Sequence, residues 1–241
     1  MCKLSIITIV FNNKDGLEKT FNSIFCQTYD DFEYIVIDGG STDGSVELAN
    51  SLVDSIDYYV SEKDNGIYDA MNKGLSVARG EWVSFMNSGD AFADCNVLSK
   101  IFSDDFNADF IYSDVFFLRG GLFVCSKQSR RIVHQSLLYK RSMHDIYGNY
   151  IVYPGFTCAD YFFFQCASNA RWVKTSTVIA VYDDSGVSTS LNHFKQRIAI
   201  DIALGSVGRL SGAFILLIHP VYNFLKNKIR SLYGFCLRRD I

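Results

Sequence analysis

Short apolar runs alternate with amphipathic stretches through the first half of the chain. The run Leu4–Val10 is apolar, rich in β-branched residues, and short enough to indicate a buried strand rather than a helix. In the next stretch, Leu17, Phe21, Ile24 and Phe25 recur at helical spacing. The alternation continues with predicted strands at 34–38, 56–60 and 82–86 and predicted helices around 46–53 and 67–75.

Strands that alternate with helices of this length form βαβ units, so we predict an α/β fold with a mixed, mostly parallel sheet flanked by helices. Ligands bind such sheets just beyond the carboxyl ends of the strands. Asn12, Asp38 and Asp90 each follow a predicted strand. The arrangement therefore predicts a nucleotide site at that edge of the sheet.

The second half of the chain has a weaker pattern. We predict strands at 110–115 and 172–182 and a helix at 159–167. No internal repeat and no linker rich in Pro or Gly divides the sequence. At 241 residues, the chain suits one large domain with a sizeable core.

The net charge of −3 gives no reason to expect nucleic-acid binding, but the charge is unevenly distributed. From Leu191 onward the chain has eight Lys or Arg and two acidic residues. Within this tail, Leu210–Leu225 is uncharged, interrupted by Pro220, and shorter than the roughly 20 residues needed to span a bilayer. We expect this segment to lie at a membrane interface; the alternative is a tail packed on the catalytic domain or on another subunit.

The seven cysteines are scattered and contain no Cys-x-x-Cys pair, which argues against a zinc site and against a disulfide framework. Reduced thiols in a cytosol are the expected state. The N-terminal Met1–Ser5 leads directly into a predicted strand and lacks the layout of a signal peptide. We therefore expect a cytoplasmic protein, peripheral at the inner membrane face where the tail binds lipid.

Seven motifs follow one another along the chain: Ser5–Asn12, Val36–Gly44, Asp64–Gly74, Ala78–Asp90, His134–Gln135, Ala159–Tyr161 and Gly186–Ser188. The first four resemble the nucleotide-binding half of glycosyltransferase family 2, and the last three are similar to its acceptor half. The resemblance covers roughly residues 3–190 and implies a Rossmann-like GT-A fold. It implies a glycosyltransferase domain at 1–205, with halves at 1–95 and 96–205, and a tail at 206–241.

Asp38 is a candidate for recognising the nucleotide base. A carboxylate at the end of a strand can accept the imide N–H of uracil, but position alone explains Asp38 equally well as an Asx-turn residue. The resemblance favours the base contact, and with it UDP, with GDP and dTDP as alternatives. It also implies that Thr8 and Phe11 flank the base and that Ser41 belongs to the binding turn.

Asp64 and Gly66 precede a predicted helix, whose N-terminus favours negative charge. The resemblance implies that both contact the nucleotide, and simple N-capping by Asp64 is the alternative. Lys73 lies near the far end of this helix. The family pattern lets Lys73 reach the nucleotide, whereas an isolated lysine on a helix is usually a solvated surface residue.

Asn87–Asp90 occupies the position of the family's acidic metal motif. The resemblance implies that Asp90 binds Mn²⁺ or Mg²⁺ together with the diphosphate, and that Asn87 hydrogen-bonds a ribose hydroxyl. The chain departs from the common motif, because Asn87 and Gly89 stand where acids are frequent. Metal binding is therefore expected only with nucleotide present, and a plain loop turn is the alternative.

Asp160 stands at the position that resembles the family's general base, which takes the proton of the acceptor hydroxyl during inverting transfer. The alternative is an N-cap for the apolar helix that follows. His134 and Gln135 are expected to line the pocket for the donor sugar or diphosphate. A histidine in an apolar setting is also well explained as a hydrogen-bonded core residue.

The resemblance thus predicts a metal-dependent, inverting hexosyl- or N-acetylhexosaminyltransferase. Its donor would be a nucleotide-sugar, and its acceptor a carbohydrate such as a lipid-linked oligosaccharide of a surface polysaccharide. One alternative is a nucleotidyltransferase that makes a nucleotide-sugar, although the loop Phe11–Gly16 lacks the Gly-rich basic sequence of such enzymes. The other is a non-catalytic subunit of a polysaccharide-synthesis complex, which the single carboxylate of the metal motif allows.

Overall fold

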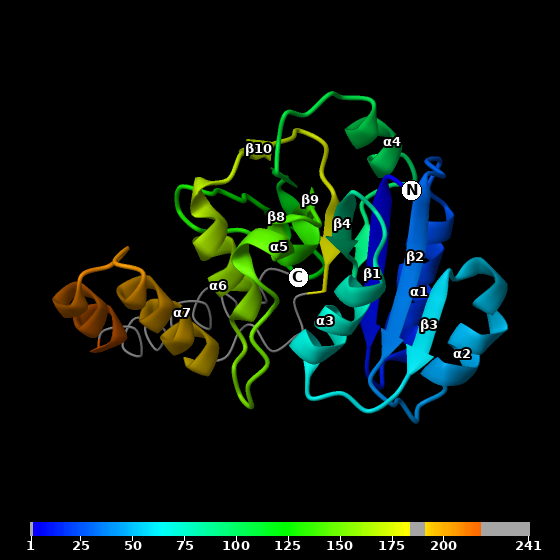
Figure 1. The fold of residues 1–241 in the computed structure, drawn as a ribbon, viewed down its shortest axis with the longest axis horizontal. Coiled ribbons are helices and arrows are strands. Elements are labelled where there is room, and N and C mark those ends of the chain that lie inside the picture. The colour runs from blue at the N-terminus through cyan, green and yellow to red at the C-terminus, as the bar shows by residue number, and fades with distance from the viewer. Residues whose placement is uncertain (1, 184–190, 218–241) are drawn as a thin grey trace, which may run out of the picture. The chain divides into compact units, whose positions relative to one another are not determined.

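The computed structural model describes residues 2–183 and 191–217 (Figure 1). They belong to two compact units, Met1–Gly186 and Val187–Ile241. The second unit contains helix α7 (Leu191–Ala203), and no helix among the residues described is both long and apolar enough to cross a bilayer. Residues 218–241 of the predicted tail and the Gly186–Ser188 motif lie outside the described residues, and the domain boundary after residue 205 stays a prediction.

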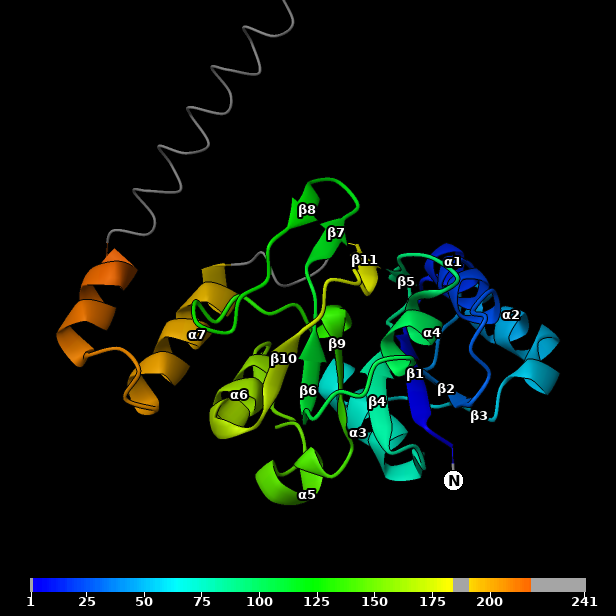
Figure 2. The same ribbon diagram turned by 90° about the horizontal axis from the view of Figure 1, so that it is seen from above.

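A seven-stranded sheet forms the centre of the first unit (Figures 1 and 2). Its strands, in spatial order, are β10 (Trp172–Lys174), β6 (Phe110–Tyr112), β9 (Leu137–Lys140), β4 (Trp82–Phe85), β1 (Leu4–Val10), β2 (Phe32–Asp38) and β3 (Tyr58–Ser61). All neighbouring pairs are parallel except those of β9, which runs antiparallel to both β4 and β6. The predicted mixed, mostly parallel sheet is confirmed.

Helices α1 (Lys14–Phe25) and α2 (Ser45–Ser51) cover one face of this sheet, and α3 (Ile67–Val77) covers the other (Figure 2). Right-handed crossovers require this arrangement, because the chain steps outward from β1 to β3 and then returns past β1 to β4. Gly74 allows α3 to approach the sheet closely. A Cβ at this position would lie 2.6 Å from Cγ2 of Ile7.

A smaller sheet contains β5 (Ala91–Phe92), β11 (Ala180–Tyr182), β7 (Val115–Phe117) and β8 (Gly121–Phe123), in that order. The single strands predicted at 110–115 and 172–182 are therefore wrong, because each run divides between the two sheets. The chain changes sheets at Ser113 and Asp114, where the Ser113 hydroxyl donates to the Asp114 carbonyl at 2.6 Å. The remaining helices are α4 (Val97–Phe102), α5 (Met143–Tyr147) and α6 (Ala159–Cys166).

Cys26, which follows α1, and Cys95, which precedes α4, form a disulfide with their Cα atoms 5.2 Å apart. The prediction of reduced thiols is wrong for this pair. The two cysteines are 69 positions apart, so packing rather than sequence spacing brings them together. The same packing is seen where the N–H of Thr28 donates to the carbonyl of Cys95 at 2.8 Å.

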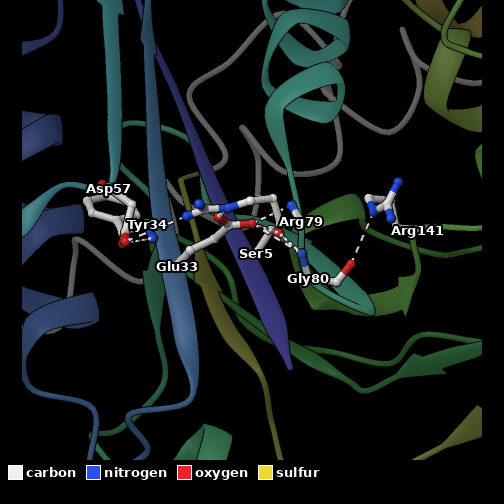
Figure 3. Close-up of polar contacts among 7 residues, drawn as sticks. All are labelled: Ser5, Glu33, Tyr34, Asp57, Arg79, Gly80 and Arg141. Atoms are coloured by element: carbon white, nitrogen blue, oxygen red, sulfur yellow. Dashed lines mark hydrogen bonds and ion pairs between the residues drawn. The ribbon is translucent and has the colours of Figure 1, made fainter. Parts of the chain in front are cut away.

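Glu33 is the centre of a polar network at the edge of the sheet where the parallel strands begin (Figure 3). It is 3 % exposed and accepts hydrogen bonds from the Ser5 hydroxyl at 2.6 Å, from Nε of Arg79 at 2.7 Å and from the Gly80 N–H at 3.1 Å. Burial alone would raise the pKa of Glu33, but the hydrogen bonds from Ser5 and Arg79 and the Arg79 charge hold it below its ordinary value. The network fixes the turn that leads from α3 into β4.

We predict that Glu33→Gln lowers the free energy of unfolding by about 2 kcal/mol, the typical contribution of hydrogen bonds to a charged group. Urea unfolding at neutral pH measures the change. Glu81→Gln removes only an exposed ion pair with Lys3 and should cost less than about 0.5 kcal/mol.

The effect should also depend on pH. Because the pKa of Glu33 is lowered in the folded state, the advantage of the wild type is present above the ordinary value of 4.5 and is lost as the pH falls below it. A difference between the two proteins that stayed constant at every acidic pH would contradict this account of Glu33.

Candidate functional site

The end of β1 is tied both to β4 and to the turn after β2. Thr8 is 0 % exposed, and its hydroxyl donates to the carbonyl of Met86 at 2.8 Å, so the side chain of this predicted site residue holds β1 to the segment after β4. Asn12 has a φ of +48°, in the left-handed region that Asn tolerates. Its Oδ1 accepts the N–H of Thr42 at 2.8 Å, and its own N–H donates to Oγ of Ser41 at 2.8 Å.

Asp38 has one engaged carboxylate oxygen and one that is buried without a partner. Oδ1 of this residue, which is 1 % exposed, accepts hydrogen bonds from the N–H groups of Gly40 and Ser41 and from Oγ of Ser61, all within 2.8 Å. Oδ2 has no hydrogen-bond partner in the described part of the chain. Because such an atom is costly to leave unpaired, it suits a ligand N–H. The Asx turn and the predicted base contact are thus compatible, since they use different oxygens.

Phe11 and Asp64 border the backbone that follows Asp38. A Cβ at Gly39 would lie 3.3 Å from Cδ2 of Phe11 and 2.5 Å from Oδ2 of Asp64. The Phe11 ring is 63 % exposed. An exposed aromatic ring beside Gly39, the residue after Asp38, can stack on a planar base while the Asp38 carboxylate contacts the edge of that base.

The next three predicted residues lie in the segment that leads into α3 and in α3 itself. Gly66, with a φ of +106°, is the N-cap of α3, so Asp64 does not cap the helix but accepts the Gly66 N–H at 2.9 Å. Lys73 bends back toward this segment, with Nζ 2.8 Å from Oε1 of Glu62. The hydrogen bond to Glu62 is the main reason that the pKa of Lys73 is raised.

Helix α1 holds the 87–90 turn in position, where the Thr20 hydroxyl donates to the carbonyl of Asp90 at 2.7 Å. Gly89 in this turn has a φ of +103°, a conformation that favours glycine. A Cβ at Gly89 would also lie 3.3 Å from Oδ2 of Asp183. In this backbone an acid at position 89, where the family motif often has one, would be strained.

Asp90 is buried against a second carboxylate. Its Oδ1 accepts the N–H of Asp183 at 2.8 Å. Burial raises the pKa of Asp90 to about 7, and the negative charge of Asp183 adds to the shift. Hydrogen bonds from the Asp183 N–H and the Gln135 side chain, together with the charge of Lys19, oppose it.

The residues around Asp90 offer only oxygen donors, the kind that Mg²⁺ and Mn²⁺ prefer. Asn87 contributes a buried Oδ1 that has no partner within residues 2–183 and 191–217. Over those same residues, no group of three or more His, Cys, Asp or Glu side chains could hold a metal alone. The donor set therefore fits a cation that takes its remaining ligands from a bound diphosphate.

Asp160 lies in the first turn of α6, whose N-cap is Cys158, so Asp160 is not the cap. Oδ1 of Asp160 accepts hydrogen bonds from the Tyr68 hydroxyl at 2.7 Å and from the Tyr161 N–H at 2.8 Å. Oδ2 lies 3.8 Å from Nδ1 of His134. Because the side chain is 27 % exposed and Oδ1 is engaged, Oδ2 is the oxygen that a substrate can reach.

One short turn contacts both predicted carboxylates. In the 3₁₀ turn His134–Ser136, the His134 ring faces Asp160 and the Gln135 side chain hydrogen-bonds Asp90. The predicted pocket pair therefore joins the predicted metal ligand to the predicted base.

Two residues that contact these carboxylates were not predicted. Tyr68 lies within the Asp64–Gly74 motif, but nothing in its spacing indicates a contact with Asp160, 92 positions away. Asp183 directly follows β11, and an acid after a strand is the signal that was used in the first half of the chain. The strand predicted at 172–182 ends at the same residue, so this signal was present in the sequence and could have identified Asp183.

Solved structures share this fold. S. aureus TarS 1–349 in complex with UDP-GlcNAc matches with a TM-score of 0.71 and 17% identity, over 89% of this chain and 70% of that chain. A longer TarS structure matches with a TM-score of 0.69 and 19% identity, over 83% of this chain, which spans 39% of that one. The mannosyltransferase PcManGT of Pyrobaculum calidifontis, in complex with GDP-Man and Mn²⁺, gives 0.65 and 16%, over 84% and 64%.

Sequence relatives agree with the fold. A PGL/p-HBAD biosynthesis glycosyltransferase of Mycobacterium bovis is 29% identical over 219 residues, which are 83% of this chain and 86% of that protein. The profile of the family described as Glycosyl transferase family 2 matches residues 5–159, more than half of the chain. The chain therefore belongs to glycosyltransferase family 2 and has its GT-A fold.

Proposed function

We propose that this glycosyltransferase moves one hexose or N-acetylhexosamine from a nucleotide-sugar to a hydroxyl of a carbohydrate acceptor, with inversion at the anomeric carbon. The observation that carries the proposal is the pair of contacts made by one turn, His134 with Asp160 and Gln135 with Asp90. A carboxylate suited to take a proton and one suited to hold a cation are thereby linked. Transfer of a sugar needs both groups at the same site, because the proton is taken from the acceptor while the diphosphate leaves the donor.

The proposed donor is a UDP-sugar. Support comes from the unpartnered Oδ2 of Asp38, which can accept the imide N–H of uracil, and from the exposed Phe11 ring beside the next residue, Gly39. TarS, which shares the fold, binds UDP and UDP-GlcNAc. Guanine also presents a ring N–H, and PcManGT binds GDP-Man, so a GDP-sugar is the alternative donor.

In the proposed reaction, Oδ2 of Asp160 takes the proton of the acceptor hydroxyl while the hydroxyl oxygen bonds to the anomeric carbon. The bond from that carbon to the diphosphate oxygen breaks, and the diphosphate leaves with the electron pair. Attack from the opposite face inverts the configuration. Tyr68 and the Tyr161 N–H orient the carboxylate through the hydrogen bonds that they donate to Oδ1.

Asp90, Asp183 and Asn87 are the residues proposed to hold Mn²⁺ or Mg²⁺. The cation would neutralise charge on the departing diphosphate. Their oxygen donors support this role, as does the Mn²⁺ bound by PcManGT.

The proposed acceptor is a lipid-linked oligosaccharide at the cytoplasmic face of a membrane, with the basic tail lying at the lipid surface. The excess of Lys and Arg from Leu191 onward supports this placement. Membership of glycosyltransferase family 2 argues against the alternative of a nucleotidyltransferase. The activity of the Asp160→Asn variant, described next, distinguishes an enzyme from a non-catalytic subunit.

We predict that Asp160→Asn lowers kcat by about 100-fold or more, because the proton of the acceptor hydroxyl loses its base. The affinity for the donor should not change. Release of nucleoside diphosphate, followed with nucleotide-sugars and candidate acceptors, measures the rate. Asp54→Asn, an exposed acid in the 3₁₀ turn Val53–Ser55, is the matched control and should keep the full rate. Full activity of Asp160→Asn would rule out the proposed base.

We predict that Asp90→Asn weakens Mn²⁺ binding in the presence of UDP at least about tenfold, because the neutral amide replaces a carboxylate ligand. Isothermal titration of Mn²⁺ into the protein saturated with UDP measures the affinity. Asp94→Asn serves as the control, since Asp94 is exposed and paired with Lys100. Equal Mn²⁺ affinity in Asp90→Asn and the wild type would remove Asp90 from the proposed metal site.

We predict that Asp38→Asn changes the base preference from uracil toward cytosine. The Asn carbonyl oxygen can keep the hydrogen bonds of Gly40, Ser41 and Ser61, which leaves the amide N–H₂ at the position of Oδ2. That group repels the imide N–H of uracil and matches the ring nitrogen of cytosine. Titration should show UDP affinity about tenfold to 100-fold lower, with tighter binding of CDP. Unchanged UDP affinity would exclude the base contact.

A further inference from the structure

A chain of buried polar side chains runs from behind Asp160 to the surface. Nε2 of His134 lies 3.2 Å from the Tyr150 hydroxyl, which is 2.8 Å from the Tyr139 hydroxyl. The Tyr139 hydroxyl lies 3.0 Å from Nε2 of His144, whose Nδ1 is 3.1 Å from the carbonyl oxygen of the exposed residue Gly148. The four side chains that form this hydrogen-bonded chain are all buried: His134, Tyr150, Tyr139 and His144.

The carbonyl of Gly148 fixes the direction of the first hydrogen bond, because a carbonyl oxygen only accepts. Nδ1 of His144 must therefore carry the proton. Burial lowers the pKa of His144 to about 4, so the ring is neutral at neutral pH and its Nε2 is an acceptor. The Tyr139 hydroxyl consequently donates its only proton to Nε2 of His144.

The same direction passes along the two tyrosines. Since the Tyr139 proton is used, Tyr139 accepts the hydrogen bond from the Tyr150 hydroxyl. Since the Tyr150 proton is then used as well, Nε2 of His134 must donate to Tyr150. Burial lowers the pKa of His134 to about 4, so the ring is neutral and holds one proton only. That proton is on Nε2, and Nδ1 carries a lone pair.

The contact between His134 and Asp160 agrees with this direction. Nδ1 and Oδ2 are 3.8 Å apart, which is too long for the hydrogen bond that an Nδ1–H group would make with a carboxylate. Oδ1 of Asp160 is already engaged by Tyr68 and Tyr161, so Oδ2 is the oxygen that faces His134.

We propose that the hydrogen bonds from Gly148 to His134 keep Nδ1 of His134 unprotonated, so that His134 accepts a hydrogen bond from Oδ2 of Asp160 once that oxygen has taken the acceptor proton. The two atoms are 3.8 Å apart before proton transfer and move within hydrogen-bond distance after it. His134 is thus a positioning residue that acts through Asp160, and this inference rests on the proposed function. The proton moves from the acceptor hydroxyl to Oδ2, where it is shared with Nδ1, and it passes to water after the product leaves, which restores the carboxylate. No proton leaves the His134 ring, so each hydrogen bond from His134 to Gly148 keeps the same donor and the same acceptor throughout the reaction.

Packing alone does not account for the hydroxyl groups. The ring of His134 packs on Phe85, with centroids 4.9 Å apart, and on Tyr150 at 5.7 Å. Phenylalanine at either tyrosine position would keep its ring contacts. A Tyr→Phe substitution therefore removes one link of the chain and preserves the packing.

The direct test is the tautomer of His134 in the full-length protein, measured by ¹⁵N NMR at neutral pH. We expect a proton on Nε2 and none on Nδ1 in the wild type. In Tyr139→Phe, the Tyr150 hydroxyl loses its acceptor and turns to Nε2 of His134, so the His134 proton should move to Nδ1. Tyr112→Phe, which alters a buried tyrosine of β6 outside the chain, should leave the wild-type tautomer. A proton on Nδ1 in the wild type, or an unchanged tautomer in Tyr139→Phe, would overturn the proposal.

Kinetics separates this proposal from the proposed function. Tyr139→Phe should lower kcat about tenfold, a modest part of the effect of a general base, with KM for the donor unchanged. Tyr112→Phe should match the wild type. Unchanged kcat in Tyr139→Phe together with loss of activity in Asp160→Asn would refute the role of the chain and leave the base intact. Full activity in Asp160→Asn would refute both.

Discussion

Strand β1 pairs in parallel with β2 on one side and β4 on the other, so the chain leaves all three strands at one edge of the sheet. That constraint places Asp38 and the 87–90 turn at the same edge. Asp38 ends β2, and the 87–90 turn follows β4. The hydrogen bond from the Thr8 hydroxyl to the Met86 carbonyl holds the end of β1 beside the segment after β4. At the opposite edge, Glu33 secures the beginnings of the same strands. The packed central strands therefore fix the relative positions of Asp38 and the 87–90 turn.

Three carboxylates near this edge have different surroundings, and the surroundings separate their proposed roles. Asp38 has three donors on one oxygen and none on the other, which suits reading a single N–H group. Asp90 is buried beside a like charge, an arrangement that a cation would relieve. Asp160 is partly exposed, and its Oδ1 accepts the hydrogen bonds of Tyr68 and Tyr161. The His134–Ser136 turn contacts the last two, through His134 and Gln135.

The first half of the fold was predictable because buried parallel strands are continuous apolar runs and the helices between them are amphipathic. The second half was less so, since its strands are only three or four residues long and two apolar runs divide between sheets. For the site, position after a strand was sufficient to suggest Asp38 and Asp90. Tyr68, Asp183 and the Cys26–Cys95 disulfide depend on contacts between segments 69 to 93 positions apart, which local periodicity does not record.

Asp183 has a consequence for how this chain can change over time. It approaches Asp90 from β11, a strand of the smaller sheet, although the rest of the 87–90 turn is supported by α1. Gly89 leaves no room for a closer acid, because its φ of +103° and its contact with Asp183 both favour glycine. The carboxylate pair is thus encoded jointly by the two halves. If one half were exchanged for one from a protein that carries both acids within the turn, the hybrid would have either three carboxylates near this position or only one. The pair is therefore kept only when both halves change together.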